Sequence, residues 1–432
     1  MNDGMPETKN TDQGLQLARD LDANDELRAF RQQFHFPKDE TGQQTLYFVG
    51  NSLGLQPKRT AEYVQEELDK WKELAVRGHT EHERPWMPYH EFLTETMAEL
   101  VGAQANEVVM MNSLTANLHF LMATFYRPTA LRHKILIENL AFPSDYQVAF
   151  SQIEWHGFDP QESLLVVPSE ESGVVLQERI EQTIKEQGDS IALILLPGVQ
   201  YYTGQVFDIA AITQLAHQQG IVVGFDLAHA AGNIRLNLHA DNVDFAAWCS
   251  YKYLNSGPGS VGGCFVHERH ASQVDTPRLA GWWGHDKASR FKMRSEFKAI
   301  PTAEGWAVSN PPILSLAAIR ASLDVFAEVG GMSKLIAKTA LMTDFLQRQL
   351  KSRLGDRVKI ITPEEPRGCQ LSLQVNCQGV AGKDVHRRLE TMNVESDWRE
   401  PNVIRVAPAP LYNSFEDCFH LVDRLERCLT DA

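Results

Sequence analysis

The chain has 432 residues, of which 43% are hydrophobic and 22% are charged, as in an ordinary globular protein with room for two structural units. Its formal net charge of −15 argues against nucleic acid or an anionic membrane as the main partner. No apolar run is long enough to span a membrane. Residues 1–13 lack the pattern of a signal peptide, so we expect a cytoplasmic protein.

The cysteines and histidines give no sign of a metal site. The six cysteines form no CxxC pair, and the fifteen histidines include no HExxH motif. In a reducing compartment the cysteines are most simply small apolar residues.

The first fifty residues show little regular pattern. Residues 1 to about 20 read as a loose polar leader, and a short strand near 47–49 gives way to a glycine-containing loop. Val64, Leu68, Trp71 and Leu74 then repeat at helical spacing, and Gly78 is a plausible stop. The loop that follows, residues 79–86, is charged and ends in an aromatic residue.

Residues 88–267 alternate between helical and strand patterns. Strands are expected near 108–111, 134–138, 164–167, 191–196, 221–225, 243–249 and 264–266, and helices near 89–101, 115–126, 176–186 and 208–219 and from residue 143. Such alternation predicts an α/β fold whose mostly parallel, seven-stranded sheet is covered on both faces. Sheets of this kind bind ligands at the carboxyl ends of their strands.

The pattern changes after a pair of prolines at 311–312. One long helical segment, about 313–352, precedes strands near 358–361, 370–375 and 403–406 and helices at 382–392 and 415–429. We therefore predict a smaller C-terminal α+β domain over 311–432. The large domain covers 46–310, and residues 1–45 form the leader and a segment of the small domain.

Lys252 lies where an apolar strand meets a polar, glycine-containing loop. Desolvation there favours the neutral amine, which can attack the aldehyde of pyridoxal phosphate. A lysine that extends from a strand end into solvent explains this stretch alone equally well.

Asp226 ends an apolar strand 26 residues earlier and is followed by Leu227, Ala228 and His229. A buried carboxylate at this edge could keep a pyridine nitrogen protonated, and His229 could flank the cofactor or substrate. The alternative is a helix N-cap beside a packed histidine. Taken together, the lysine and the aspartate favour a cofactor site.

Two strand-to-helix junctions could bind the phosphate group. Thr115 follows Asn112-Ser113-Leu114 at the start of an amphipathic helix, where backbone N–H groups converge, although it could be only a cap. Residues 141–145 repeat the arrangement. There Pro143 suits a first helical turn, Ser144 and Asp145 are polar, and Phe142 could stack on a cofactor or belong to the core.

These residues belong to longer motifs with a familiar order. Residues 226–229 (DLAH), 250–255 (SYKYLN) and 405–413 (RVAPAPLYN) resemble the class V aminotransferase group of fold-type-I pyridoxal phosphate enzymes. Within that group, five further motifs resemble the kynureninases: FVGNSLGL (48–55), FPSD (142–145), GVQYYTGQ (198–205), GWWGH (281–285) and SNPPI (309–313). The resemblance runs from about residue 45 to 415.

The resemblance implies a role for each matched position. Lys252 would form the Schiff base, Asp226 would pair with the pyridine nitrogen, and Phe142 would stack on the ring. The other expected cofactor contacts are Leu114, Thr115, Pro143, Ser144, Asp145, His229 and Tyr251, with Trp282 and Asn310 from the second subunit of a homodimer. Arg405 would bind the substrate carboxylate, and Ser52, His79, His285 and Asn310 would lie near the rest of the substrate. Pro197 departs from the pattern, since some members have a serine there.

The implied activity is hydrolysis of a carbon–carbon bond in tryptophan catabolism, on a route toward NAD biosynthesis. L-kynurenine, or its 3-hydroxy form, would give an anthranilate and L-alanine, with Lys252 and Tyr251 moving protons. The enzymatic alternatives are an aminotransferase and a cysteine desulfurase, for which Cys369 is the only plausible persulfide acceptor. A binding or scaffold protein without catalysis is the alternative from another class.

Overall fold

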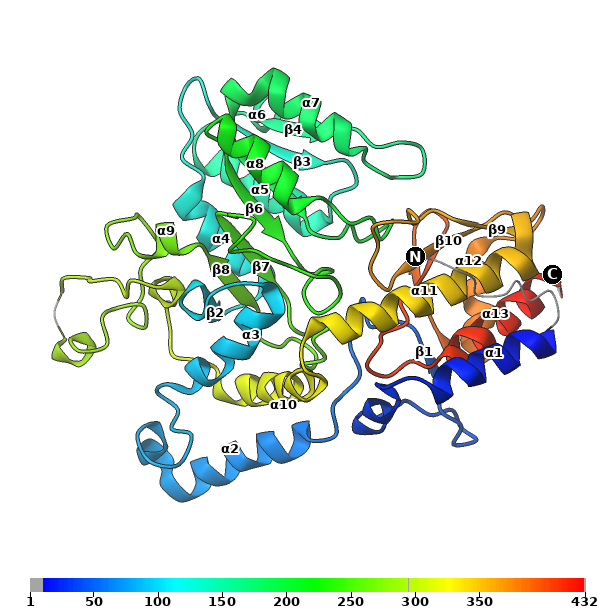
Figure 1. Cartoon of the computed structure of the whole chain (residues 1–432). Helices are drawn as coiled ribbons and strands as arrows, with labels where there is room; N and C mark the ends of the chain where they lie inside the picture. The colour runs from blue at the N-terminus through cyan, green and yellow to red at the C-terminus, as the bar shows by residue number, and fades with distance from the viewer. Residues whose placement is uncertain (1–10, 294, 431–432) are drawn as a thin grey trace.

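A seven-stranded sheet forms the centre of the larger unit (Figure 1). The computed structural model describes residues 11–293 and 295–430. The strand order is β2-β8-β7-β6-β5-β3-β4. The bounds are β2 Val108–Met110, β3 Lys134–Glu138, β4 Leu164–Val167, β5 Ile191–Pro197, β6 Val222–Asp226, β7 Phe245–Trp248 and β8 Gly263–Val266.

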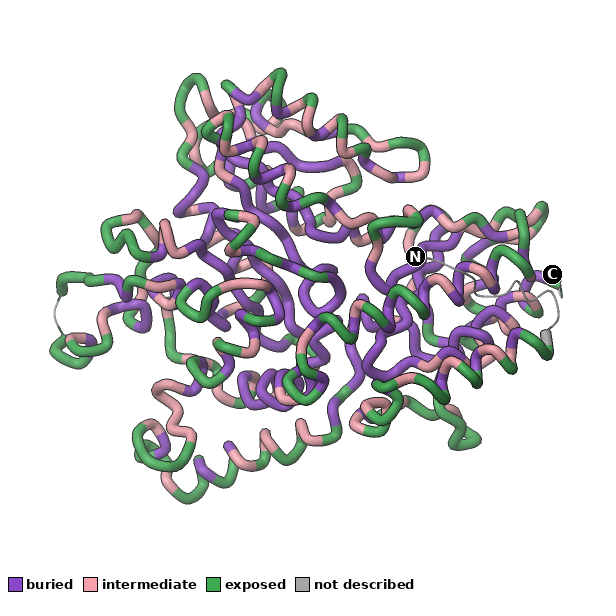
Figure 2. Tube along the Cα trace, viewed as in Figure 1, coloured by how far each residue is buried: buried purple, intermediate pink, exposed green. Residues whose placement is uncertain are grey.

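The sheet is mostly parallel, as the sequence predicts. Strands β3 to β7 pair in parallel, whereas β8 is antiparallel to both β7 and β2. All seven residues of β5 are buried, because helices cover both faces of a parallel sheet. Figure 2 shows the central strands as the most continuously buried part of the chain.

The two faces of the sheet belong to two hydrophobic cores. On β3, Leu136 joins the core that contains Ile180 of α7 and Ile212 of α8. Its neighbours Ile135 and Ile137 join the other core, with residues of α4 and α5, since successive side chains of a strand point to opposite faces. These helices are α4 Leu114–Phe125, α5 Pro143–Trp155, α7 Gln177–Gln187 and α8 Ile209–Gln218.

The C-terminal unit contains a four-stranded antiparallel sheet, in the order β12-β13-β10-β9. Its strands are β9 Val358–Ile360, β10 Leu371–Val375, β12 Asp397–Arg399 and β13 Val403–Val406. Helices α11 Met332–Leu354, α12 Gly382–Thr391 and α13 Phe415–Thr430 accompany it. The short strand β12 was not expected, and it carries Arg399, which lines the cavity of the candidate site.

The prediction of a loose leader is wrong where the structure can test it. Residues 1–10 lie outside the described part, but Thr11–Ala23 forms helix α1, which packs beside α13 (Figure 1). The Asp22 carboxylate accepts hydrogen bonds from the backbone N–H groups of Phe415 (2.8 Å) and Glu416 (2.9 Å) at the start of α13. An N-terminal segment therefore caps a C-terminal helix.

The long helical segment expected over 313–352 is two helices, α10 Ile313–Val329 and α11 Met332–Leu354. Gly330 and Gly331 separate them, with φ angles of +84° and +92°. Glycine adopts this left-handed region without steric cost, so the pair ends one helix and redirects the chain into the next.

The division into a large and a small domain stays a proposal, and packing refines it. Strand β1 (Leu46–Tyr47) pairs in parallel with β11 (Val394–Glu395), so it lies against the C-terminal unit. Helix α10 contributes Leu316 and Phe326 to the core of the large unit. We therefore propose that α10 belongs with the large unit, and that the chain enters the small unit along α11.

The remaining elements are short or lie at the edges. Helices α2 Thr60–Leu74 and α3 Thr94–Val101 pack near α10, while α6 Pro160–Ser163 and α9 Glu268–Ala271 are single turns. The 3₁₀ segments are Arg28–Gln33, Ala75–His79, Tyr89–Leu93, Ala105–Glu107, Gly188–Ser190, Arg290–Lys292, Ala303–Trp306 and Gly355–Arg357. No helix within residues 11–293 and 295–430 is long and apolar enough to cross a bilayer.

Candidate active site

A cavity of about 300 Å³ lies at the carboxyl ends of the central strands, where open α/β sheets bind ligands. Its walls come from the ends of β3, β5 and β6, from the loops after β1 and β7, and from β12. The lining residues are Asn51, Ser52, Ser113, Leu114, Thr115, Glu138, Phe142, Ser144, Asp145, Pro197, Val199, Tyr201, Asp226, Ala228, His229, Tyr251, Lys252, Gly259, Ser260 and Arg399. Most of the residues singled out in the sequence are therefore together.

Lys252 extends into the cavity from the loop after β7. Its Nζ lies 3.0 Å from Nε2 of His229 and 5.8 Å from the centre of the Phe142 ring. Burial, followed by the nearby positive charges of Lys252, Arg405 and Arg399, holds the pKa of His229 well below its usual range. The imidazole is therefore neutral, and its Nε2 can accept a hydrogen bond from the Lys252 amine.

Asp226 ends β6 with a buried carboxylate. Its Oδ1 accepts a hydrogen bond from the backbone N–H of Ala228 (2.7 Å), and a side-chain hydrogen bond joins it to Asp145. Burial and the negative charge of Asp226 raise the pKa of Asp145 well above its usual range. Burial raises the pKa of Asp226 as well. Asp145, whose pKa lies well above its usual range, is the proton donor of the pair, and Asp226 accepts.

Glu138, at the end of β3, is a third buried carboxyl group on the cavity wall. Burial raises its pKa to about 8, and the charge of Asp226 adds to the shift. This residue was not among those predicted for the site. One signal in the sequence could have identified Glu138. It is an acidic residue at the end of an apolar strand, four positions before the FPSD motif.

Two helix starts face the cavity without side-chain caps. Helix α4 begins at Leu114, and α5 begins at Pro143 after Phe142. Neither N-terminus has a side-chain cap hydrogen bond, so the alternative of Thr115 as a simple cap is not observed. The backbone N–H groups and the helix dipole at the start of α4 suit an anionic group such as phosphate. The start of α5 offers fewer donors, because Pro143 has no N–H and the Asp145 N–H donates to the Phe142 carbonyl (2.9 Å). Ser144 lines the cavity, whereas Pro143 borders a separate surface hollow.

Tyr251 and Tyr201 provide aromatic walls. Burial raises the pKa of both hydroxyls above their usual range, so both remain protonated donors. The Tyr201 ring meets the Phe142 ring edge-on at 5.1 Å between centres. Tyr201 belongs to the motif GVQYYTGQ, but it had been given no role.

Arg405 is not among the residues that line the cavity. Its side chain is 1% exposed. The guanidinium donates to the backbone carbonyl of Tyr201 (2.7 Å) and to Asp397 Oδ1 (3.2 Å), while Nη2 lies 2.8 Å from Asp397 Oδ2. The arginine that does reach the cavity is Arg399, six residues earlier on β12.

Four further expected residues lie elsewhere in the single chain. Trp282 and His285 border a hollow formed by residues 280–297, and Asn310 borders another beside Trp283. His79 follows α2, and its ring meets Trp86 edge-on at 5.2 Å between centres. Ser52, by contrast, lines the cavity. Of the expected site residues, these four, Pro143 and Arg405 are not among those that line the cavity.

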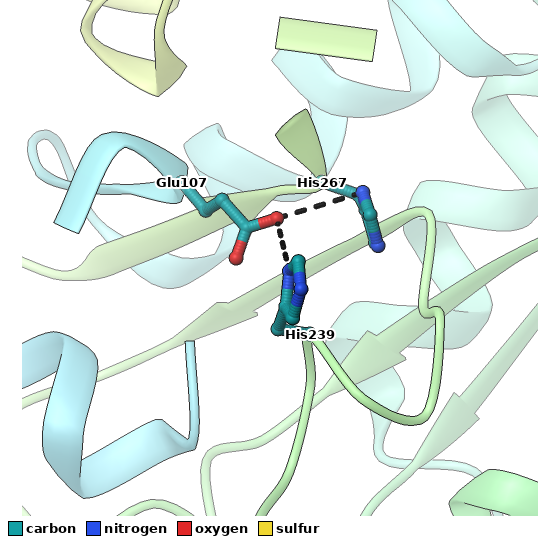
Figure 3. A group of neighbouring side chains, drawn as sticks. All are labelled: Glu107, His239 and His267. Atoms are coloured by element: carbon teal, nitrogen blue, oxygen red, sulfur yellow. Dashed lines mark hydrogen bonds and ion pairs between the residues drawn. The ribbon is translucent and has the colours of Figure 1, made fainter. Parts of the chain in front are cut away.

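One buried cluster has the composition of a metal site but is explained by hydrogen bonds (Figure 3). Glu107 Oε1 accepts from His239 Nδ1 (3.0 Å) and from the backbone N–H of Glu268 (2.8 Å), and it lies 3.5 Å from His267 Nδ1. His267 Nδ1 in turn accepts from the backbone N–H of Arg269. The two imidazole rings stack 24° from parallel, so their nitrogen lone pairs do not converge on one ion.

The residues around the cavity fit pyridoxal 5′-phosphate. Two buried polar atoms there, Asp145 Oδ1 and His229 Nδ1, have no partner within the chain. Lys252 is a primary amine for the aldehyde, Asp226 is an anion for the pyridine nitrogen, and the α4 N-terminus suits the phosphate. This donor set matches the aldehyde, the pyridine nitrogen and the phosphate of the cofactor.

Two family models match the chain. The model described as the kynureninase C-terminal domain matches residues 335–425, and that described as aminotransferase class I and II matches residues 48–246. The aminotransferase model describes class I and II, whereas the sequence motifs resemble the class V group. Together the two models cover parts of both structural units.

Solved structures of low sequence identity have the same fold. A cysteine desulfurase, CsdA of Escherichia coli, superposes with a TM-score of 0.74 at 17% identity, covering 94% of this chain and 98% of that one. A mutant of C-DES with glycine covalently linked to its PLP cofactor also gives a TM-score of 0.74 at 17% identity, covering 88% and 96%. The α/β fold predicted from the sequence is confirmed.

Curated relatives match over almost the whole chain. A kynureninase of Koribacter versatilis is 52% identical over 411 residues, which is 94% of this chain and 96% of the relative. A kynureninase of Myxococcus xanthus is 51% identical over 413 residues, covering 95% and 96%. The chain therefore belongs to the kynureninase family.

Proposed function

We propose that the protein is a kynureninase that hydrolyses the Cβ–Cγ bond of L-kynurenine or 3-hydroxy-L-kynurenine. The products are anthranilate or 3-hydroxyanthranilate, and L-alanine. The observation that carries the proposal is one cavity that combines the Lys252 amine, the Asp226 carboxylate and the Phe142 ring. The chain that contains this cavity is 52% identical to a kynureninase of Koribacter versatilis, over 94% of the present chain.

The cofactor of this reaction is pyridoxal 5′-phosphate, which when bound supplies an electron sink for negative charge at the substrate Cα. We propose that Asp226 holds the pyridine nitrogen protonated, with the neutral Asp145 as its hydrogen-bond partner. The N–H groups at the start of α4 would bind the phosphate, with the side chains of Thr115 and Ser144 beside them. His229 and Phe142 would border the ring.

Lys252 is the proposed carrier of the Cα proton. Once the lysine is released from the cofactor aldehyde it is a free amine, and a free amine can remove a proton from the substrate. The neutral His229, 3.0 Å from Nζ, accepts a hydrogen bond from this amine and orients it. A charged imidazole at that distance would repel the ammonium form, so the depressed pKa of His229 suits the cycle.

Tyr251 is proposed to deliver or receive protons during bond cleavage. Water adds its oxygen to the acyl carbon, which becomes the carboxylate of anthranilate, and a proton ends on Cβ to form the methyl group of alanine. Tyr251 lines the cavity beside Lys252 and remains protonated, so it can serve as a general acid. A Tyr251→Phe variant that turns over as fast as the wild type would remove this role.

The active site is proposed to be completed by a second copy of the chain. Trp282, Asn310, His79 and His285 lie outside the cavity of their own subunit. Trp282 is 41% exposed, and large exposed apolar side chains favour an interface. We propose a homodimer in which these residues face the partner's cavity. The six cysteines form no disulfide with one another, which supports a reducing, cytoplasmic location.

The desulfurase alternative is not favoured by the cysteines. Cys369, the candidate persulfide acceptor, is fully buried, and burial raises the pKa of its thiol to about 12. A persulfide acceptor needs a reactive thiolate that can reach the substrate. None of the chain's six cysteines lines the cavity.

The decisive experiment is to mix the purified, cofactor-loaded protein with L-kynurenine and to measure anthranilate fluorescence and L-alanine together. Wild-type protein should form both products in equal amounts, and Lys252→Gln should form neither. The exposed Lys287, ion-paired with Glu91 and Glu304, provides a matched control as Lys287→Gln. Absence of both products from the wild type would refute the proposed function.

A further inference from the structure

The C-terminal unit contacts both loops that carry the Lys252 and His229 pair. The contact is made by residues 367–370, just before β10. Cys369 of this segment is fully buried and packs against Tyr253, the residue that follows Lys252. Because the nitrogen atoms of Lys252 and His229 lie 3.0 Å apart, a shift of either loop would change the distance between them.

Asn233 makes the contact with the His229 loop. It follows His229 by four residues, and its Nδ2 donates to the His229 carbonyl at 2.9 Å. Its Oδ1 accepts from the backbone N–H of Cys369 at 2.9 Å. The two partners are a carbonyl and an N–H of the main chain, so only one orientation of the amide satisfies both. One side chain thus joins the His229 loop to the C-terminal unit.

The His229 carbonyl depends on this amide. Within residues 11–293 and 295–430, Asn233 Nδ2 is its hydrogen-bond donor, whereas the backbone N–H of Asn233 donates to the Ala230 carbonyl at 3.0 Å. A buried carbonyl that loses its donor costs free energy. Loss of the Asn233 amide therefore favours a different position of the His229 backbone.

Gly368 shows how closely the two units approach each other. A Cβ at this position would lie 2.4 Å from Nδ2 and 2.6 Å from Oδ1 of Asn233, which is too close for any side chain. The φ angle of Gly368 lies outside the left-handed region. Close approach to the amide, and not backbone conformation, therefore requires the glycine.

We propose that Asn233 is a positioning residue, which transmits the docking of the C-terminal unit to His229 and so fixes the imidazole against the Lys252 amine. This inference rests on the proposed function and deepens it. The neutral His229 accepts a hydrogen bond from Nζ, and such an acceptor favours the protonated form of that nitrogen. Without the Asn233 amide, His229 shifts and Nζ loses its acceptor.

The test follows the visible absorption of the cofactor-loaded enzyme as a function of pH, because this absorption reports the protonation of the nitrogen that Lys252 contributes. Asn233→Ala should move the midpoint to lower pH by about 0.5 unit or more, which is about a threefold change in the protonation equilibrium. It should also lower kcat for L-kynurenine by about tenfold or more, with a smaller change in KM, since a small misplacement of a reacting group is costly.

Gly368→Ala disturbs the same contact from the C-terminal unit. Its methyl group would press on the Asn233 amide, so it should move the absorption midpoint in the same direction. The double variant Asn233→Ala/Gly368→Ala should be no more impaired than Asn233→Ala alone, because removal of the amide leaves room for the methyl group. Such non-additivity is expected when two residues act through one contact.

Asn413→Ala is the matched control. The Asn413 amide is also buried, donates to a backbone carbonyl (Tyr47, 3.0 Å) and accepts from a backbone N–H (Ala409, 2.9 Å). Neither of these partners lies in the His229 or Lys252 loop. Asn413→Ala should lower the unfolding free energy, as Asn233→Ala does, but it should leave the absorption midpoint and kcat unchanged.

Two results would overturn the inference. An unchanged midpoint and kcat in Asn233→Ala would reduce the residue to a stabiliser of the fold, and additive effects in the double variant would mean that the two residues act separately. If Asn233→Ala does not fold, an unchanged midpoint in Gly368→Ala is equally contradictory. Failure of the proposed function is distinguishable, because it requires that the wild type itself form no anthranilate.

Discussion

Gly54 lies directly against the backbone of Lys252. A Cβ at position 54 would be 2.3 Å from the Lys252 carbonyl oxygen and 2.2 Å from Asn255 Oδ1. The Gly54 N–H also donates to the carbonyl of Tyr251 at 2.8 Å. The glycine-containing loop after β1 therefore packs on the loop that carries the candidate catalytic lysine, two hundred residues away in sequence.

Gly54→Ala should displace Lys252 and lower kcat for L-kynurenine by about tenfold or more, since a small misplacement of a reacting group is costly. The visible absorption of the bound cofactor should change as well. Gly188→Ala is the control, because its nearest neighbour is the flexible side chain of Gln219 at 3.1 Å. Unchanged kinetics and absorption in Gly54→Ala would show that the lysine loop can move aside without consequence.

Glu138 should make the stability of the protein depend on pH. Burial raises its pKa to about 8 from an ordinary value of 4.5, so the folded state retains a proton that the unfolded state loses between these values. The stabilisation from this group is complete below pH 4.5 and is lost as pH rises through 8, with a slope of at most about 1.4 kcal/mol per pH unit.

Glu138→Gln removes that titration. Relative to the variant, the wild type should lose unfolding free energy between pH 5 and pH 8, as measured by urea denaturation of the cofactor-free protein. The control is Glu364→Gln, because this side chain is 73% exposed and pairs with Lys351. Parallel pH curves for wild type and Glu138→Gln would mean that Glu138 ionises normally in the folded protein.

Asp244 should be a major stabilising residue far from the cavity. Its carboxylate accepts from His217 Nε2 (2.9 Å), His270 Nε2 (2.7 Å), the Val223 N–H (2.8 Å) and Arg269 (2.6 Å). Although burial alone would raise it, these hydrogen bonds hold the pKa of Asp244 below its usual range. The resulting stabilisation is present above pH 3.8 and is lost only as pH falls below that value.

Asp244→Asn leaves the cationic and N–H partners without their anion, and it should lower the unfolding free energy by about 3–5 kcal/mol. Thermal denaturation and urea titration at pH 7 measure this loss. Asp384→Asn, at a position where the side chain is 59% exposed, should change stability by less than about 0.5 kcal/mol. If Asp244→Asn changed stability as little as Asp384→Asn, Asp244 would not be a major stabilising residue.

Lys70 and Glu67 form an ion pair in which both side chains are fully buried on α2. Lys70 Nζ also donates to the Arg84 carbonyl (2.8 Å), and Glu67 accepts from Trp86 Nε1 (2.7 Å). The pair thus attaches the loop that contains His79 to α2. Lys70→Met should destabilise the protein by about 3–5 kcal/mol, because it leaves the buried Glu67 carboxylate with only Trp86 Nε1 and, at 3.8 Å, Arg320 Nη1 as partners.

The double variant Lys70→Met/Glu67→Gln should recover part of that loss, since it removes both charges. Lys72→Met, at an exposed position on the same helix, is the matched control, and urea denaturation gives all three values. A double variant less stable than Lys70→Met alone would show that Glu67 stabilises the loop without its lysine partner.

The sequence was most informative where a strand is buried on both faces. All seven strands of the central sheet were expected near their observed positions, because each is a short apolar run between glycine or polar segments. The strand-end residues Asp226 and Lys252 could be assigned to one site for the same reason, since parallel strands place their carboxyl ends at one edge of a sheet.

Patterns that depend on exposure were less reliable. The helical repeat of Leu68 and Trp71 predicted α2 correctly, yet these side chains are 37% and 62% exposed, while Glu67 and Lys70 are buried. Helix α1 was missed because its partner, α13, lies four hundred residues away. Polar sequences become ordered when distant segments satisfy their hydrogen bonds, and no local pattern encodes that partner.

The amino-acid sequence by itself determined the α/β architecture, the family and the lysine–aspartate pair, because these follow from local periodicity and from motifs of fixed order. Only the tertiary structure decided that Arg399 and not Arg405 reaches the cavity, that Glu138 lies on its wall, and that Trp282 and Asn310 lie outside it. The physical reason is that side-chain direction and burial depend on which strands pair and which helices cover them. Sequence spacing alone does not define those long-range contacts.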